Sequence, residues 1–318
     1  MNETAPTPSV LRAVLDDTLA RHADAPADIA AALLAQAPTL PADAEGAEAI
    51  RLAEHVLLGH CADTDSLAAF VAALPSALTY DAATAPSLQR VRWALAQLRV
   101  QGRVQGRMPA QPEPDSSPEL PDAPRWRALQ NVVLALAGLG RCGEAAALLA
   151  ADEAAARAHG AGEAGVAYAA AANNVAGHLQ TGDPGAGAGR GAPRDAERDA
   201  LMLQAAAIAR RAWDSAGNWM QVERAEYRLA LCHAAAGNGA AAVHHAGLCL
   251  SGCQAAGDAA DAVEHYFALE ALVRAHRAGG DAPAATAALQ RMAALLLQIS
   301  EADGLRDWCA ETLADLQR

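Results

Sequence analysis

The sequence contains no lysine, and all 24 of its basic residues are arginine. This absence excludes mechanisms that depend on a lysine amine, including Schiff bases, phosphate-loop lysines and Ser-Lys dyads. Aromatic residues make up only 3% of the 318 residues, although 53% of the chain is hydrophobic. Alanine, the strongest helix former, supplies most of that excess. Because no stretch alternates apolar and polar residues as a β-strand would, the composition predicts an all-α fold.

Acidic residues outnumber basic ones by 37 to 24, which gives a formal net charge of −13. This balance argues against nucleic-acid binding, since that requires a basic surface. The sequence shows no signal peptide and no apolar run long enough to cross a bilayer. The cysteines are Cys61, Cys142, Cys232, Cys249, Cys253 and Cys309. Their lack of a framework spacing is typical of reduced thiols, so we predict a cytoplasmic protein, and the arginine bias suggests a GC-rich bacterium.

One pattern recurs along the chain: an apolar helix, a turn with Gly-Asp, Gly-Asn or a close variant, and an alanine-rich helix. It reads LALAGLGRCGEAAALL at 134–149, LALCHAAAGNGAAAVHHA at 229–246 and LVRAHRAGGDAPAATAAL at 272–289. The pivot glycines are Gly140, Gly182, Gly237 and Gly280, at intervals of 42, 55 and 43 residues. Glycine adopts the left-handed conformation that ends the first helix, and Asp or Asn caps the second. Each unit is therefore predicted to be a helical hairpin that stacks on its neighbours.

These units resemble tetratricopeptide-type repeats, in which two antiparallel helices meet at a Gly-Asp or Gly-Asn turn. Around Gly237 the small or apolar residues that match the family are Leu229, Ala230, Ala242 and Cys249. The resemblance covers about 126–292, and the units are longer than the family's usual repeat of about 34 residues. It implies a right-handed α-α superhelix, a solenoid of antiparallel helical hairpins.

On this basis we divide the chain into three parts. Residues 1–107 are predicted to be a helical region, and whether they continue the same superhelix is left open. Residues 108–124 contain six prolines and no periodicity, which indicates a linker or long loop. Residues 125–318 are predicted to form the repeat domain, with an insertion at 182–195 and a C-terminal capping helix.

The segment HHAGLCLSGC at 244–253 raises the question of a metal site. His245, Cys249 and Cys253 would share one helix face, and Cys232 and His233 would approach from the partner helix. A ligand- or metal-responsive module using these helices is our alternative function. Against it, Cys249 occupies a packing position of the repeat, and structural zinc sites use closer ligand pairs. We therefore assign no metal ligand and no cofactor.

Four histidines occupy a related position near the end of a predicted first helix. They are His178, His233 and His276, four residues before their glycines, and His60, four residues before Thr64. A histidine there fills space and is favoured by the helix dipole, with a pH-dependent role as the alternative. The sequence also lacks the HExxH, GxSxG and phosphate-loop motifs, so we assign no catalytic residue and predict that the protein is not an enzyme.

The predicted concave face carries the residues that we assign to partner binding. Arg224 and Arg228 lie one helical turn apart with Tyr227 beside them, and paired guanidinium groups suit carboxylates. One version of the resembled family holds a peptide's terminal carboxylates with basic and amide side chains. Arg224, Arg228 and Asn173 match three of its five positions.

Arg274 and Arg277 extend this predicted groove into the last repeat. The competing interpretation is that the arginines pair with glutamates of the same wall, such as Glu223, Glu226 or Glu264. The sequence therefore predicts a non-catalytic scaffold or adaptor that binds an acidic protein or peptide segment. It predicts no interaction with nucleic acid or membrane.

Overall fold

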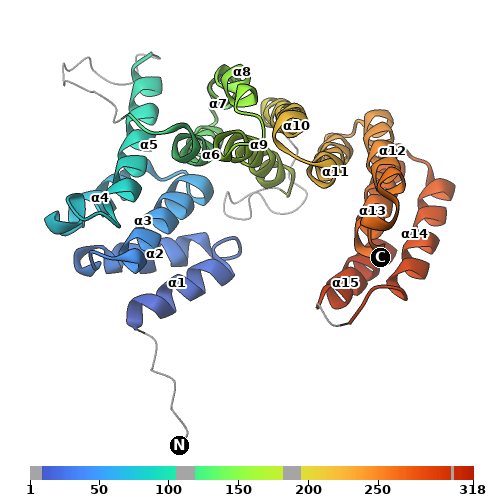
Figure 1. The fold of residues 1–318 in the computed structure, drawn as a ribbon, viewed down its shortest axis with the longest axis horizontal. Coiled ribbons are helices and arrows are strands. Elements are labelled where there is room, and N and C mark those ends of the chain that lie inside the picture. The colour runs from blue at the N-terminus through green and yellow to red at the C-terminus, as the bar shows by residue number, and fades with distance from the viewer. Residues whose placement is uncertain (1–8, 105–118, 182–194, 302–303) are drawn as a thin grey trace, which may run out of the picture. The chain divides into compact units, whose positions relative to one another are not determined.

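A computed structural model describes residues 9–104, 119–181, 195–301 and 304–318 of the chain. Across these ranges the elements are helices and no strand is formed, which confirms the all-α prediction (Figure 1). None of the helices in these ranges is both long and apolar enough to cross a membrane. Most of the predicted linker, and all of the predicted insertion except Asp195, lie outside the described residues.

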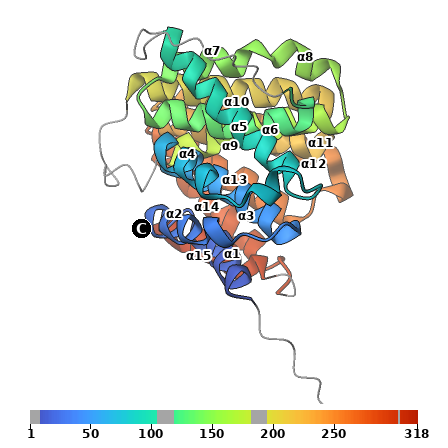
Figure 2. The same cartoon turned by 90° about the vertical axis from the view of Figure 1, so that its left-hand side faces the viewer.

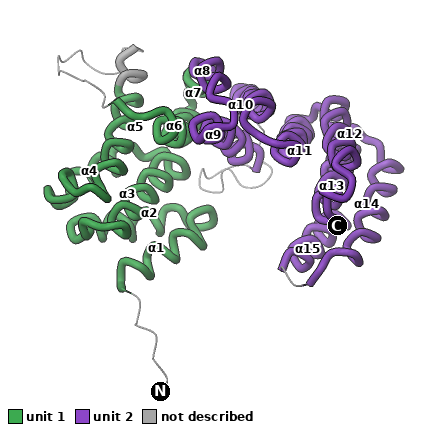
Figure 3. The backbone as a smooth tube through the Cα atoms, in the orientation of Figure 1, with its two compact units in different colours: residues 1–149, 182–193 green, residues 150–181, 194–318 purple. Residues whose placement is uncertain are grey.

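The contacts divide the chain into two compact units (Figure 3). Unit 1 comprises the described residues up to Leu149. Unit 2 comprises Ala150–Thr181 and the described residues from Asp195 onward.

Figure 2 shows the helices of unit 1, coloured from blue to green. They are α1 (Val10–Arg21), α2 (Pro26–Gln36), α3 (Ala44–Glu54), α4 (Thr64–Ala73), α5 (Ala85–Val104), α6 (Asp122–Gly138) and most of α7 (Cys142–Ala151), with the 3-10 turns η1 (Ala37–Thr39) and η3 (Ser76–Thr79). Aspartates start two of these helices: Asp43 accepts a hydrogen bond from the Gly46 amide and Asp63 from the Ser66 amide. Such caps satisfy backbone donors that the first turn leaves unpaired.

A π-helix, η2 (His55–His60), continues α3 without a break. It packs against α2, α3, α4 and α6, and its apolar residues Val56, Leu57 and Leu58 are buried. The core of unit 1 therefore surrounds this segment. In unit 1, α6 packs against α5 and η2, and the predicted boundary between the helical region and the repeat domain stays a prediction.

Unit 2 consists of helices that pack in sequence-adjacent pairs. They are α8 (Glu153–Ala158), α9 (Glu163–Thr181), α10 (Ala196–Ala216), α11 (Trp219–Ala235), α12 (Gly239–Ala256), α13 (Ala262–Ala278), α14 (Ala282–Leu296) and α15 (Leu305–Gln317), with the 3-10 turn η4 (Gly257–Ala259). The hairpins α9/α10, α11/α12 and α13/α14 follow one another, and the first helices α9, α11 and α13 contact in turn. We call the surface formed by these first helices the first-helix wall.

The predicted hairpin glycines have the expected backbone conformation. Gly140, Gly237 and Gly280 have φ angles of +70°, +76° and +74°. The amide after each glycine donates a 2.8 Å hydrogen bond to the carbonyl five residues earlier, which closes the helix end. The glycine conformation is therefore confirmed at three positions, and Gly182 lies outside the described residues. The predicted cap of the second helix is confirmed for Asp281, which accepts a hydrogen bond from the Ala284 amide, whereas the Asn238 side chain makes no cap hydrogen bond.

Two glycines of α12 are expected to respond oppositely to alanine. A Cβ at Gly239 would lie 2.5 Å from the Gly279 Cα, whereas a Cβ at Gly247 would meet no atom within 4 Å. We expect Gly239→Ala to lower the free energy of unfolding by about 1–2 kcal/mol through overpacking. Gly247→Ala should raise it by about 0.8 kcal/mol because alanine favours the helix. Urea denaturation of both variants checks this, and equal shifts would contradict the close approach of the two hairpins.

The last helix, α15, packs against α13 and α14. Its residues Cys309, Leu313 and Leu316 are buried in a cluster that includes Tyr266 and Met292. The Tyr266 hydroxyl donates a 2.6 Å hydrogen bond to the Cys309 carbonyl. These contacts fix α15 against the apolar end of the α13/α14 hairpin.

Candidate functional site

The first-helix wall of unit 2 carries the arginines that the sequence assigned to partner binding. Arg224 of α11 is 61% exposed, and its Nη2 atom donates to Glu264 in the first turn of α13. The interpretation that this arginine pairs with a glutamate of the wall is therefore confirmed for Glu264. The guanidinium is nevertheless still open to solvent.

A second connection between α11 and α13 runs through Glu270. The Tyr227 hydroxyl donates to its Oε2 atom at 3.0 Å, and Arg274 Nε donates to its Oε1 atom at 2.7 Å. Glu270 itself is buried, and burial together with this carboxylate raises the pKa of Tyr227. Arg277 is held separately, because its Nη2 atom donates to the Leu316 carbonyl of α15.

Arg228 connects α11 to α9. Its Nη1 atom donates to Gln180 Oε1 at 3.1 Å, and a Cβ added at Gly177 would lie only 3.1 Å from Arg228 Cζ. The guanidinium thus lies against the backbone of α9, and its Nε atom is buried without a hydrogen-bond partner among the described residues. Asn173 is half-buried on α9 and is not hydrogen-bonded to these arginines.

Four of the six predicted residues therefore take part in hydrogen-bonded contacts between successive first helices. The contacts form three separate groups: Arg224 with Glu264, Tyr227 and Arg274 with Glu270, and Arg228 with Gln180.

The histidines and cysteines of 232–253 do not converge on one point. The buried thiol of Cys249 donates to Glu223 Oε1 at 2.7 Å, and Cys253 donates to the same atom at 3.6 Å. Burial and the Glu223 carboxylate raise the pKa of Cys253 to about 12 and raise that of Cys249 as well. These cysteines are thus held as neutral thiols, whereas metals bind the thiolate.

His245 of the same region contacts a different carboxylate, that of Glu226. His245 Nδ1 lies 2.7 Å from Glu226 Oε2, and Arg210 Nε lies 2.5 Å from Glu226 Oε1. The His233 ring stacks on His245 with the ring centroids 5.3 Å apart. Of the side chains that the sequence grouped as a potential metal site, Cys249 and Cys253 thus contact Glu223 and His245 contacts Glu226. Cys232 contacts the Ala176 carbonyl oxygen of α9 instead.

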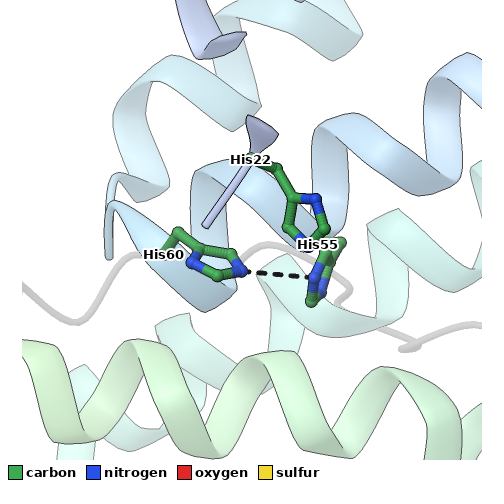
Figure 4. A group of neighbouring side chains, drawn as sticks. All are labelled: His22, His55 and His60. Carbon is green, nitrogen blue, oxygen red and sulfur yellow. Dashed lines mark hydrogen bonds between the residues drawn. The ribbon is translucent and has the colours of Figure 1, made fainter. Parts of the chain in front are cut away.

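A different group of histidines meets in unit 1. Figure 4 shows His22, which follows α1, facing His55 and His60 of the π-helix. The ring centroids lie 4.9–5.2 Å apart, and one ring nitrogen from each histidine lies within 4.8 Å of the others. The Nε2 atoms of His55 and His60 are 3.3 Å apart. We call these three residues the histidine cluster; among the described residues it is the one group with potential metal-ligand geometry.

Hydrogen bonds orient two rings of the histidine cluster. His22 Nδ1 lies 2.9 Å from the Thr18 carbonyl oxygen, and His55 Nδ1 lies 3.1 Å from Asn131 Oδ1. The buried Asn131 in turn donates to Glu54 Oε1 at 2.8 Å. A chain of contacts thus runs from the cluster to a fully buried carboxylate.

The sequence pattern does not group these histidines. His60 alone is predicted at a helix end, as one of four such histidines, and no pattern distinguishes His22 or His55. The spacing of five residues between His55 and His60 would place them about 140° apart around an α-helix. A π-helix has more residues per turn, so the structure brings them together where the sequence pattern does not.

No known protein-family model and no curated protein sequence matches this chain. Membership of the tetratricopeptide-type family therefore stays a prediction that rests on the hairpin turns and the helix pairing.

Proposed function

We propose that the protein is a non-catalytic adaptor, a tetratricopeptide-like right-handed superhelix whose first-helix wall binds an acidic segment of a partner protein. The observation that carries this proposal is that the Arg224 guanidinium is exposed and only partly engaged in hydrogen bonds. It is 61% exposed, and only its Nη2 atom is engaged within the described residues, by Glu264. A guanidinium has five N–H donors, so Nε and Nη1 can face a second carboxylate.

The existing ion pair leaves room for a second carboxylate. The Glu264 side chain is only 11% exposed and keeps its contact with Nη2, so an incoming carboxylate would bind the exposed remainder of the guanidinium in addition to Glu264. Arg274 lies on the next first helix, is 42% exposed and is held by Glu270. An extended acidic segment could therefore meet guanidinium groups on two successive hairpins.

The rest of the proposal concerns the compartment in which the adaptor acts and the class of partner that it binds. The protonated, buried thiols of Cys249 and Cys253 fit a reducing compartment, and we place the protein in the bacterial cytoplasm. The separate contacts of Cys249 and Cys253 with Glu223, and of His245 with Glu226, weigh against the metal-responsive alternative at 232–253. The surface near Arg224 is expected to recognise protein carboxylates, consistent with a chain whose net charge of −13 disfavours nucleic acid.

The test compares two substitutions that should change the affinity for the partner in opposite directions. Partners are captured from the host cytosol and identified, and the binding segment is then titrated by fluorescence anisotropy. Arg224→Ala should weaken binding about tenfold because it removes the guanidinium. Glu264→Gln should strengthen binding several-fold, since it removes a competing carboxylate.

Arg291→Ala is the matched control, because Arg291 is an exposed arginine on α14, a second helix outside the wall. Its binding should equal that of the wild type. Equal affinity of all three variants, or weaker binding by Glu264→Gln, would contradict the proposed role of the wall.

A further inference from the structure

We propose that His22, His55 and His60 bind a divalent transition-metal ion of the zinc class through three imidazole nitrogens, leaving one position for water or an anionic ligand. The site lies in unit 1 and does not depend on the adaptor function proposed for unit 2. It also differs from the His/Cys segment 244–253, in which the sequence suggested metal ligands.

The spacing of the nitrogens fits the coordination geometry. Zinc binds imidazole nitrogen at 2.0–2.1 Å with tetrahedral angles, so two ligand nitrogens lie about 3.3–3.4 Å apart. The Nε2 atoms of His55 and His60 are 3.3 Å apart, which is one edge of such a tetrahedron. One nitrogen of each of the three rings lies within 4.8 Å of the others. Side-chain movement of about 1.5 Å or less would complete the triangle.

Hydrogen bonds fix the protonation of two of the rings so that each offers its Nε2 atom to a metal ion. His22 Nδ1 contacts the Thr18 carbonyl oxygen, and His55 Nδ1 contacts the amide oxygen of Asn131. Both oxygens can only accept a hydrogen bond, so both nitrogens must donate. Both bonds place the proton on Nδ1 and the lone pair on Nε2. Histidine ligands in metal sites are oriented by the same kind of second bond.

A buried carboxylate extends this arrangement behind His55. Asn131 is 1% exposed and donates to Glu54 Oε1, and Glu54 has no solvent-exposed surface. The amide thus cannot rotate without breaking a buried hydrogen bond. A Cβ at Gly59 would lie 3.2 Å from Asn131 Oδ1, so the glycine permits the close approach of the amide to the π-helix.

The ligand set indicates the class of metal. Three neutral nitrogens without carboxylate or thiolate suit Zn²⁺, Cu²⁺, Ni²⁺ or Co²⁺, whereas Mg²⁺ and Ca²⁺ require oxygen ligands. The three side chains are half-buried, so an ion between them remains accessible to solvent. Three protein ligands leave the fourth tetrahedral position to water or another small ligand.

The π-helix is an independent observation that points to the same place. π-helices are rare and are frequently found at functional sites. Here the π-helix spans His55–His60, so its first and last residues are two of the three proposed ligands. It aligns two side chains that a regular α-helix would direct to different faces.

The experiment titrates chelator-treated, full-length protein with Zn²⁺ by calorimetry and with Co²⁺ by visible absorption. Wild type should bind one ion per chain, and the Co²⁺ spectrum should be that of a four-coordinate nitrogen and oxygen site. His22→Ala should lose at least 100-fold in affinity, and His60→Gln should behave similarly, because each removes a first ligand.

His265→Ala is the matched control. His265 Nδ1 lies 3.0 Å from the carbonyl oxygen of Asp261, four residues earlier, which reproduces the His22 contact outside the cluster. This variant should bind the metal as the wild type does. Absence of stoichiometric binding by the wild type would overturn the proposal, as would wild-type affinity in His22→Ala. A strong thiolate-to-cobalt band would place the ion on cysteine and would also overturn it.

Discussion

Replacing Arg90 by leucine is expected to lower the free energy of unfolding by about 3–5 kcal/mol, because it leaves a buried carboxylate without its counter-ion. Arg90 Nε lies 2.8 Å from Glu54 Oε2, and Arg90 Nη2 lies 3.1 Å from Glu54 Oε1. Glu54 is fully buried, whereas the Arg90 side chain is 14% exposed. Asn131 cannot compensate for the lost charge, since its amide is neutral.

The double variant Glu54→Gln/Arg90→Leu separates the lost charge from the lost packing. Its glutamine keeps an amide oxygen for Asn131 Nδ2 but carries no charge, so at least half of the stability should return. Urea denaturation followed by circular dichroism measures both variants. A cost below about 1 kcal/mol for Arg90→Leu would show that the carboxylate is solvated, and a double variant no more stable than the single one would assign the loss to packing.

Replacing Glu223 by methionine is expected to stabilise the protein by about 2–3 kcal/mol at pH 8. Glu223 is 3% exposed, and its Oε2 atom has no hydrogen-bond partner among the described residues. Its Oε1 atom accepts only from the thiols of Cys249 and Cys253, which are weak donors. Burial accordingly raises the pKa of Glu223. Methionine has a similar volume and carries neither the charge nor the unpaired oxygen.

The pH dependence of this gain follows from the direction of the pKa shift. A carboxyl whose pKa is raised by folding binds its proton more tightly in the native state than in the unfolded chain. The wild type therefore loses stability as pH rises from the ordinary pKa of glutamate, about 4.3, through the raised native pKa. Methionine does not titrate, so the advantage of the variant should be small at pH 5 and should grow toward pH 9.

Glu226→Met on the same helix provides a control of opposite sign. Burial opposes ionisation of Glu226, but hydrogen bonds from His245 and Arg210 outweigh it and lower the pKa of this carboxyl. Its replacement should destabilise the protein at neutral pH, because His245 and Arg210 lose the carboxylate to which they donate. Thermal melts of the two variants between pH 5 and pH 9 make the comparison, and a Glu223→Met variant less stable than wild type throughout would refute the expectation.

The parts of the fold that the sequence predicts correctly depend on local interactions. A glycine followed by Asn or Asp is a backbone signal that acts within one turn, and Gly237 and Gly280 accordingly have positive φ angles. Arg224 and Arg228 share a face because both lie on a regular α-helix. Their partners depend on tertiary contacts: Glu264 was one of several candidate glutamates in the sequence, and only the packing of α13 on α11 selects it.

The histidine cluster could not be predicted for a related reason. His22 lies 33 residues before His55 along the chain, and the two approach only when α1 and the π-helix fold into unit 1. Metal-site motifs on helices rely on spacings of three or four residues. The five-residue spacing of His55 and His60 is consequently overlooked, although in the π-helix it has the effect that a four-residue spacing has in an α-helix.

The position of α15 determines which surface of the α13/α14 hairpin is available to other molecules. Cys309, Leu313 and Leu316 cover the apolar side of the α13/α14 pair, which is the surface that a following hairpin would need. Stacked repeats expose such a surface at each end unless a terminal element covers it. By occupying that surface, α15 keeps it from pairing with a further hairpin, whether of the same chain or of another molecule.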